Sequence, residues 1–331
     1  MSSKSKIKEI LGVTPDTIPK HVFTSSVPII LRDLVTHWPL VKANSIKECI
    51  DDILKYYQGA PIHAFSAKKE TNGRYFYNED LSELNFTQYP VKFDEFLKQL
   101  NTPLSSYMYV GSANIDRLLP KFKNTHSLSA LSNLNPLSSI WLGNQSRIAA
   151  HQDMPNNIAC CVKGQRRFTL FPPNQIENLY IGPLDFTPAG QAISLVDFHQ
   201  PNYQKFPKFK IAQDNAFIID LNPGDALYIP SMWWHHVEAF SQFNILINFW
   251  WNTNSSVMGE PVDSLLHALL NIKELPQEQK NAWKALFDYY IFNDNKQALS
   301  HIPQDKLGIL NTKDELSFRK IRAMLLNKLN K

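Results

Sequence analysis

His151-Gln152-Asp153 is the stretch that decides the expected fold, and Ile229-Pro-Ser-Met-Trp-Trp-His-His-Val237 supplies its counterpart far along the chain. Two imidazoles and one carboxylate are the ligands of the facial triad, which binds one face of a non-haem Fe(II) and leaves the remaining positions open. Residues i and i+2 of a strand point to one face, so His151 and Asp153 can converge on one ion. The third ligand must then arrive from a distant strand, as happens in a β-barrel.

Two adjacent residues, His235 and His236, compete to be that third ligand. Neighbouring residues of a strand face opposite sides, so only one of them can point at the ion that His151 and Asp153 approach. Strand periodicity alone does not choose between them.

Short apolar runs separated by Pro, Gly and Asn fill the region from 138 to 252, a pattern typical of a sandwich or barrel of short strands. The tight turns Val162-Lys-Gly-Gln-Arg166 and Asn222-Pro-Gly-Asp225 fit the same pattern. The predicted strands are residues 138–142, 158–162, 167–171, 217–221, 226–229 and 244–250.

The flanking regions have a different character, so we expect three parts. Residues 1–137 mix a strand-like run at 22–31 with helical spacing at 45–57 and 91–100, and we expect an α/β elaboration packed on the barrel. Ser45 and Glu48 form a capping box at the start of the first helix. Residues 138–257 are the expected barrel core, and residues 258–331 are expected to be helical.

The C-terminal part carries the signals of three helices. Pro261 and Pro276 suit helix starts, and Phe318, Ile321, Leu325 and Leu329 form an apolar stripe at helical spacing. The stripe either joins a core or packs against a second copy of the chain, because a two-fold contact uses one patch twice. We expect a homodimer formed through these helices.

The composition gives no sign of a nucleic-acid-binding protein, a C-x-x-C metal or redox site, or a membrane span. The 331 residues are 44% hydrophobic and 19% charged, as in globular proteins, and the net charge of +4 does not favour a nucleic-acid partner. The three cysteines form no C-x-x-C motif. No apolar run is long enough for a membrane span or a signal peptide, so we expect a soluble, cytoplasmic protein without a membrane partner.

Residues from about 22 to 252 resemble the cupin-like branch of the JmjC oxygenases, and within it the asparaginyl hydroxylases that inhibit hypoxia-inducible factor. Beyond the His-x-Asp motif, the resemblance rests on Lys163-Gly-Gln-Arg-Arg167, Leu170-Phe-Pro-Pro173, Pro223-Gly-Asp-Ala-Leu-Tyr-Ile-Pro230, Trp233-Trp-His-His236 and Asn248-Phe-Trp250. It implies a mainly β fold, the double-stranded β-helix or jelly roll. It also implies that Fe(II), 2-oxoglutarate and O2 are used, with His151, Asp153 and His235 as metal ligands.

The same resemblance implies a set of co-substrate contacts. Arg166 occupies the position of a Lys that binds the far carboxylate of 2-oxoglutarate, although a solvent-facing turn residue is the alternative. Asn157, Asn248 and Tyr109 match other positions around the co-substrate, with Tyr107 as the competing match for Tyr109.

Two departures from the family pattern concern the co-substrate and the substrate. Ile148 replaces a Thr that helps to bind the co-substrate, and Ala192-Ile193 replaces an Arg-Gln pair that handles the peptide. A protein or peptide side chain is the substrate that we expect from the resemblance. A modified tRNA base, a small metabolite, or a non-catalytic metal-binding cupin that acts as a sensor or scaffold are the alternatives.

Overall fold

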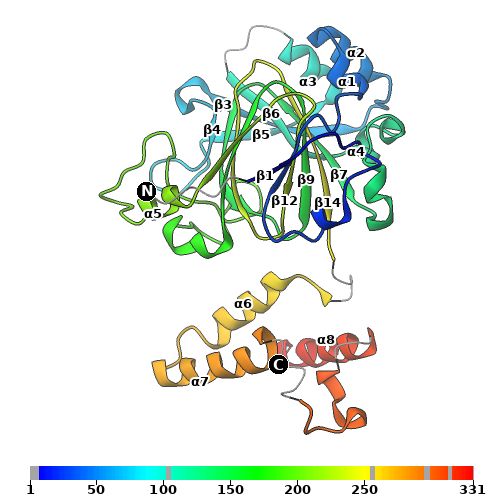
Figure 1. The fold of residues 1–331 in the computed structure, drawn as a ribbon. Coiled ribbons are helices and arrows are strands. Elements are labelled where there is room, and N and C mark those ends of the chain that lie inside the picture. Colours follow the sequence, from blue (N-terminus) through cyan, green and yellow to red (C-terminus); the bar gives the residue numbers. More distant parts are fainter. Residues whose placement is uncertain (1–6, 102–105, 254–257, 294–298, 312–314, 331) are drawn as a thin grey trace. The chain divides into compact units, whose positions relative to one another are not determined.

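The computed structural model describes residues 7–101, 106–253, 258–293, 299–311 and 315–330. The chain divides into two compact units, Met1–Asn252 and Thr253–Lys331. The first contains the barrel and everything N-terminal to it, and the second is helical (Figure 1).

Residues 137–251 contain eight strands, four in each of two facing sheets. One sheet contains the order β12-β9-β14-β7 and the other β11-β10-β13-β8, which is the jelly roll expected from the sequence. The bounds are β7 (Leu137–Gly143), β8 (Ser146–Gln152), β9 (Asn156–Lys163), β10 (Arg166–Phe171), β11 (Phe217–Leu221), β12 (Ala226–Ile229), β13 (Trp234–Ala239) and β14 (Asn244–Trp251). All six predicted runs are strands, whereas β8 and β13 lie outside them because their sequences are largely polar or small.

The N-terminal part extends both sheets rather than standing apart from them. Strands β1 (Lys8–Ile10) and β2 (Ile29–Leu31) continue the first sheet beyond β12, and β6 (Ser106–Asn114), β3 (Pro61–Lys68) and β5 (Phe86–Lys92) continue it beyond β7. Strand β4 (Arg74–Tyr75) pairs with β8 at the edge of the second sheet. The helices of this unit are α1 (Pro39–Lys42), α2 (Ile46–Leu54), α3 (Phe93–Leu100), α4 (Ile115–Leu118) and α5 (Phe209–Asp214).

The expected strand at 22–31 is wrong over most of its length. A 3-10 helix spans Lys20–Val22, and only Ile29–Leu31 pairs as a strand. The side chain of Ser25 exchanges hydrogen bonds with both main-chain groups of Val27, which competes with a sheet ladder. Pro28 then has no N–H to give to a neighbouring strand. The capping box at α2 is confirmed at its first bond, since the N–H of Glu48 donates to Ser45 Oγ at 3.1 Å.

Strand alternation separates two hydrophobic layers. The outward residues of β9 and β14 pack with α1–α4 in the largest core cluster, whereas Ala159, Cys161 and Leu246 pack between the sheets. Asn157 and Asn248 have the same inward parity as this second set. The interior of the barrel therefore carries polar side chains among apolar ones.

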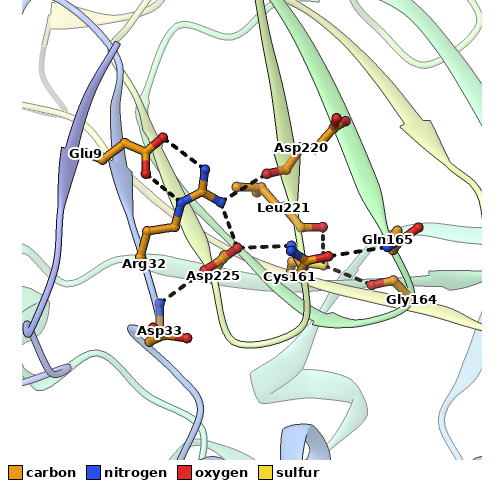
Figure 2. Close-up of polar contacts among 10 residues, drawn as sticks. Glu9, Arg32, Asp33, Cys161, Gly164, Gln165, Asp220, Leu221 and Asp225 are labelled. Carbon is orange, nitrogen blue, oxygen red and sulfur yellow. Dashed lines mark hydrogen bonds and ion pairs between the residues drawn. The ribbon is translucent and has the colours of Figure 1, made fainter. Parts of the chain in front are cut away.

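Tight turns and an ion-pair network close one end of the barrel. Gly164, with φ +74°, leaves no room for a side chain because a Cβ would lie 2.1 Å from Asn244 Oδ1. Arg32, which follows β2, donates to Glu9 at 2.9 Å and to Asp225 at 2.8 Å (Figure 2). Asp225 also accepts from the N–H of Asn222, so Arg32 ties the N-terminal edge strands to the turn before β12.

The described part of the helical unit contains α6 (Pro261–Asn271), α7 (Gln277–Phe287), a π-helical turn at Asp288–Phe292, 3-10 turns at Gln304–Lys306 and Gly308–Leu310, and α8 (Glu315–Leu329). The predicted helices are confirmed, with Pro261 at the first position of α6 and Pro276 as the N-cap of α7. Ser317 is the one buried residue in α6–α8. Within the described ranges, no helix is both long and apolar enough to cross a membrane.

Candidate metal centre

His151, Asp153 and His235 converge at one end of the barrel interior, with one ligand atom from each lying within 4.8 Å of the others. His151 on β8 is the direct cross-strand partner of His235 on β13, and their ring centroids are 4.2 Å apart. His235 Nε2 is 3.6 Å from Asp153 Oδ2. No other cluster of three such ligands occurs in the part of the chain that the structure describes.

A backbone carbonyl orients each imidazole through its Nδ1. His151 Nδ1 is 2.9 Å from the carbonyl oxygen of Ala149, and His235 Nδ1 is 3.0 Å from that of Trp233. Because a carbonyl oxygen only accepts, each ring donates from Nδ1, which leaves Nε2 as the ring atom directed toward the other ligands. Backbone carbonyls orient metal-binding histidines in this way in known sites.

A β-bulge in β8 brings His151 to the inner face. Ile148 pairs with Val237 and His151 pairs with His235, so Ala149 and Ala150 together face the single residue His236. Ile148 packs between the sheets, and the extra residue of the bulge turns His151, three positions later, to the same side. Asp153 lies just beyond the end of β8, so its placement does not come from strand alternation as the sequence argument supposed.

His236 points to the opposite face of β13. Its ring packs against Phe198 at a centroid distance of 4.6 Å, and both ring nitrogens are buried without a hydrogen bond in the described structure. Burial lowers the pKa of His236 to about 3, so the ring is neutral. The choice left open by periodicity is thus decided in favour of His235.

The charges of the triad suit a divalent cation. Burial, followed by the nearby His235, lowers the pKa of His151 to about 4. Burial alone would raise the pKa of Asp153, but His235 and His151 hold it at about 2. At neutral pH the site therefore offers a neutral imidazole at His151 and a carboxylate at Asp153, the ligand types that Fe(II) binds.

Arg166 is a buried cation without a carboxylate partner in the described residues. It begins strand β10 with inward parity, is 6% exposed, and its Nε has no hydrogen bond. Burial lowers the pKa of this guanidinium to about 10, and no ion pair involving it is found among the described side chains. A solvent-facing turn residue is therefore wrong for Arg166.

Strand register gives the separation between Arg166 and the triad. Leu170 pairs with His235, and four residues of strand from Leu170 to Arg166 cover about 13 Å. The long arginine side chain and a five-carbon diacid held at the metal together fit a separation of this order. A buried guanidinium needs an anion, and the distal carboxylate of such a diacid would supply it.

The other predicted contacts line the same interior. Asn248 Nδ2 donates to Asn157 Oδ1 at 2.8 Å, while Asn248 Oδ1 has no partner in the described structure. Tyr109 and Tyr107 both lie on the same face of β6, and Tyr109 stacks parallel to Trp141 at 6.5 Å. Contact of these residues with a co-substrate stays a prediction.

Further polar atoms in this interior were not found from the sequence. Tyr75 Oη and Trp141 Nε1 are buried and lack hydrogen bonds within the described ranges, and the Trp250 side chain, whose Nε1 is also buried, helps to lower the pKa of Asp153. Tyr75 pairs with Ile148 and Trp141 stands 6.3 Å from Trp250, centroid to centroid. In the sequence, aromatic residues in strands cannot be distinguished from ordinary core residues. Only the fold shows that the hydrogen-bonding groups of these side chains face a common interior.

Gln191 is another residue that the sequence reasoning missed. It lies in an irregular loop without a motif, and its Nε2 donates to Asp153 Oδ1 at 3.2 Å. Its neighbours Ala192 and Ile193 occupy the predicted departure from the family pattern, and Ile193 is buried beside Phe76 and Tyr77. The loop therefore reaches the metal site through Gln191.

Comparison with known proteins agrees with this geometry. Residues 15–257 match the cupin-like domain family. The chain is 31% identical to lysine-specific demethylase JMJ31 of Arabidopsis thaliana over 147 residues, 44% of this chain and 25% of that protein. It is 23% identical to lysine-specific demethylase 8 of Xenopus tropicalis over 260 residues, 76% of this chain and 54% of that protein.

A third relative is named for the synthesis of wybutosine in tRNA and not for lysine demethylation. The chain is 26% identical to tRNA wybutosine-synthesizing protein 5 of Gallus gallus over 146 residues, 40% of this chain and 43% of that protein. In all three cases the match spans between a quarter and about half of the relative's length.

Proposed function

Because this chain belongs to the cupin-like domain family, we propose that its barrel is an Fe(II)- and 2-oxoglutarate-dependent oxygenase. One observation carries the proposal: a single barrel interior holds a His-Asp-His ligand set and, further along the same sheet, the buried unpaired cation Arg166. A metal-binding protein that needed no anionic co-substrate would have no use for an unpaired guanidinium at this depth.

Each residue has a separate task in the proposed reaction. His151, Asp153 and His235 hold the metal by one face, and Arg166 binds the distal carboxylate of 2-oxoglutarate with a fork of N–H groups. Asn157 and Asn248 contribute hydrogen bonds beside it, and the stacked rings of Tyr109 and Trp141 form an aromatic wall that excludes water and can contact the co-substrate. When bound, the iron and 2-oxoglutarate supply the oxidising chemistry that inserts oxygen into a C–H bond.

For the substrate we propose a protein or peptide side chain that becomes hydroxylated. The sequence resemblance to asparaginyl hydroxylases supports this choice, and two relatives are named as lysine-specific demethylases. A modified tRNA base is the second candidate, because one relative is named for wybutosine synthesis in tRNA. The net charge of +4 is small for a protein that binds nucleic acid, which favours the peptide.

Substrate-free turnover tests the proposed chemistry. Purified protein with Fe(II), 2-oxoglutarate and ascorbate should form succinate slowly, and His151→Ala and Asp153→Ala should abolish it. Absence of succinate, together with no thermal shift on adding 2-oxoglutarate, would leave a metal-binding cupin that acts as a sensor or scaffold. Salt-sensitive retention of tRNA would favour the nucleic-acid substrate over the peptide.

We also propose that the helical unit forms a homodimer. Its helices surround a hollow of about 980 Å³, lined by apolar side chains that include Leu266, Leu270, Trp283, Leu325 and Leu329. Leu270 and Phe292 are each 72% exposed. A specific interface takes about 800 Å² from each partner, an area that an apolar surface on three helices can supply. A second copy presents the same apolar surface, so a two-fold contact covers both at once.

A further inference from the structure

The two oxygens of the Asp153 carboxylate lie in different surroundings. Oδ2 is 3.6 Å from His235 Nε2 and faces the position shared by the three ligands. Oδ1 accepts the hydrogen bond from Gln191 Nε2. The main chain of Asp153 is also held, since its carbonyl oxygen accepts from the N–H of Met232 at 2.9 Å.

The loop that carries Gln191 is fastened to the bulge that positions His151. The bulge leaves the carbonyl oxygen of Ala150 outside the ladder with β13, and the N–H of Ser194 donates to it at 2.8 Å. Ser194 Oγ donates in turn to the carbonyl oxygen of Leu179. Ile193, between Gln191 and Ser194 in the loop, is buried against Tyr77 and Ala149.

Further along, an ion-pair cluster fixes the same loop to the outer face of the second sheet. Asp197 lies 3.5 Å from the guanidinium groups of both Arg74 and Arg147. Arg147 Nε also donates to the carbonyl oxygen of Asn72 at 3.0 Å, which limits its own movement. Gln191 thus extends from a segment with several independent attachments, although its own side chain is exposed.

We propose that Gln191 is a positioning residue that keeps Asp153 bound to the metal through one oxygen. A carboxylate can bind a metal through one oxygen or through both, and a hydrogen bond to Oδ1 favours the first mode. Binding through one oxygen preserves the open positions that a bidentate co-substrate and O2 both need. The inference rests on the metal site of the proposed function, but it concerns coordination rather than turnover.

The experiment uses Co²⁺ as the probe on the full chain. Gln191→Met keeps the side-chain length and removes the donor, and Gln191→Ala is a second variant in case the thioether repacks. Gln88→Met, at an exposed position on β5, is the matched control. Co²⁺ affinity and the visible absorption spectrum of bound Co²⁺ are recorded for each protein, with and without 2-oxoglutarate.

We expect both Gln191 variants to bind Co²⁺ about 10-fold more weakly, as is usual when a partner of a metal ligand is lost. Their spectra should also differ from wild type, because Asp153 becomes free to use both oxygens, while Gln88→Met matches wild type. Wild-type affinity and spectrum in Gln191→Met and Gln191→Ala would overturn the inference. A wild-type protein that binds Co²⁺ but makes no succinate would refute the proposed function and leave this comparison valid.

Discussion

The barrel unit and the helical unit differ in the groups that they leave without contacts: polar atoms in the barrel interior and apolar side chains on the helices. The barrel buries extensive apolar clusters, yet its interior holds polar atoms without a hydrogen bond among the described residues, including Arg166 Nε, Asn248 Oδ1 and Trp141 Nε1. In the helical unit, only one residue of the three described α-helices is buried. Large apolar side chains are exposed, among them Leu270 and Phe292.

The difference indicates what each unit needs. An unsatisfied buried polar group lowers the stability of the folded protein by about 1–3 kcal/mol. A small charged ligand that hydrogen-bonds to such groups in the barrel would remove this cost. Most of the stability of a protein helix comes from tertiary packing of its apolar face. Exposed apolar helix faces would therefore be stabilised by packing against a large apolar surface. This contrast supports our proposals that the barrel carries the chemistry and that the helices form the dimer.

The largest expected effect separates two neighbouring residues of the barrel. His235→Leu should weaken metal binding by about 1,000-fold, since each ligand contributes several kcal/mol to a bound metal. His236→Leu replaces a ring that faces away from the triad, with Nε2 3.8 Å from Glu238 Oε2 and no hydrogen bond, and should leave metal affinity nearly unchanged. Titration with Co²⁺ measures both, and equal losses in the two variants would contradict the assignment of His235.

The second prediction concerns the helical unit. Leu266→Asp combined with Leu325→Asp should raise the dimer dissociation constant by about 100-fold, because each interface would then bury unpaired charges. Sedimentation equilibrium measures this change, and Co²⁺ binding by the barrel should not change with it. A wild-type chain that is monomeric at all concentrations would remove the basis for the homodimer.

The third prediction sharpens the account of the barrel interior. Arg166→Met should weaken 2-oxoglutarate binding by about 30-fold, since a charge-assisted contact contributes roughly 2 kcal/mol. The same change removes an unpaired buried charge, so the ligand-free protein should unfold at a higher temperature. Arg166→Lys keeps the charge and is the control. Unchanged 2-oxoglutarate affinity in Arg166→Met would place the co-substrate elsewhere.

The smallest predicted effect uses His126, which is buried in the core of the barrel unit. Burial lowers its pKa to about 4 from the ordinary value of 6.5, so the folded protein resists a proton that the unfolded chain accepts. This contribution to stability is complete above pH 6.5 and is lost as the pH falls from 6.5 to 4. Between pH 7 and 5.5 it amounts to about 1 kcal/mol. Denaturant unfolding of wild type should show this loss, and His126→Gln should show a smaller one.

The sequence was sufficient for the ligand types and for much of the barrel. The six apolar runs and the turns at Gly164 and Gly224 can be predicted from the sequence. Strands show a local pattern of apolar residues, and the positive φ of these turns favours Gly. The helices after Pro261 and Pro276 do the same through their period and their first residues. These features depend on interactions between residues that are close in the chain.

Apolar alternation did not mark β8 and β13, which carry both histidine ligands and are rich in polar and small residues, and only the ligand argument placed their histidines on strands. They are strands because neighbouring strands pair with them. Nor did the sequence show that Asp153 would lie beyond a strand end, or that the loop at Gln191 would reach it. Contacts between distant segments decide these points.

His151, Asp153 and one of two histidines were therefore determined as candidates by the sequence itself, since the chemistry of a ligand belongs to its side chain. Which histidine faces the metal depends on the bulge opposite His236, and the state of Arg166 depends on its burial between two sheets. A side chain's direction and its desolvation are properties of the assembled strands. Only the tertiary structure could decide them.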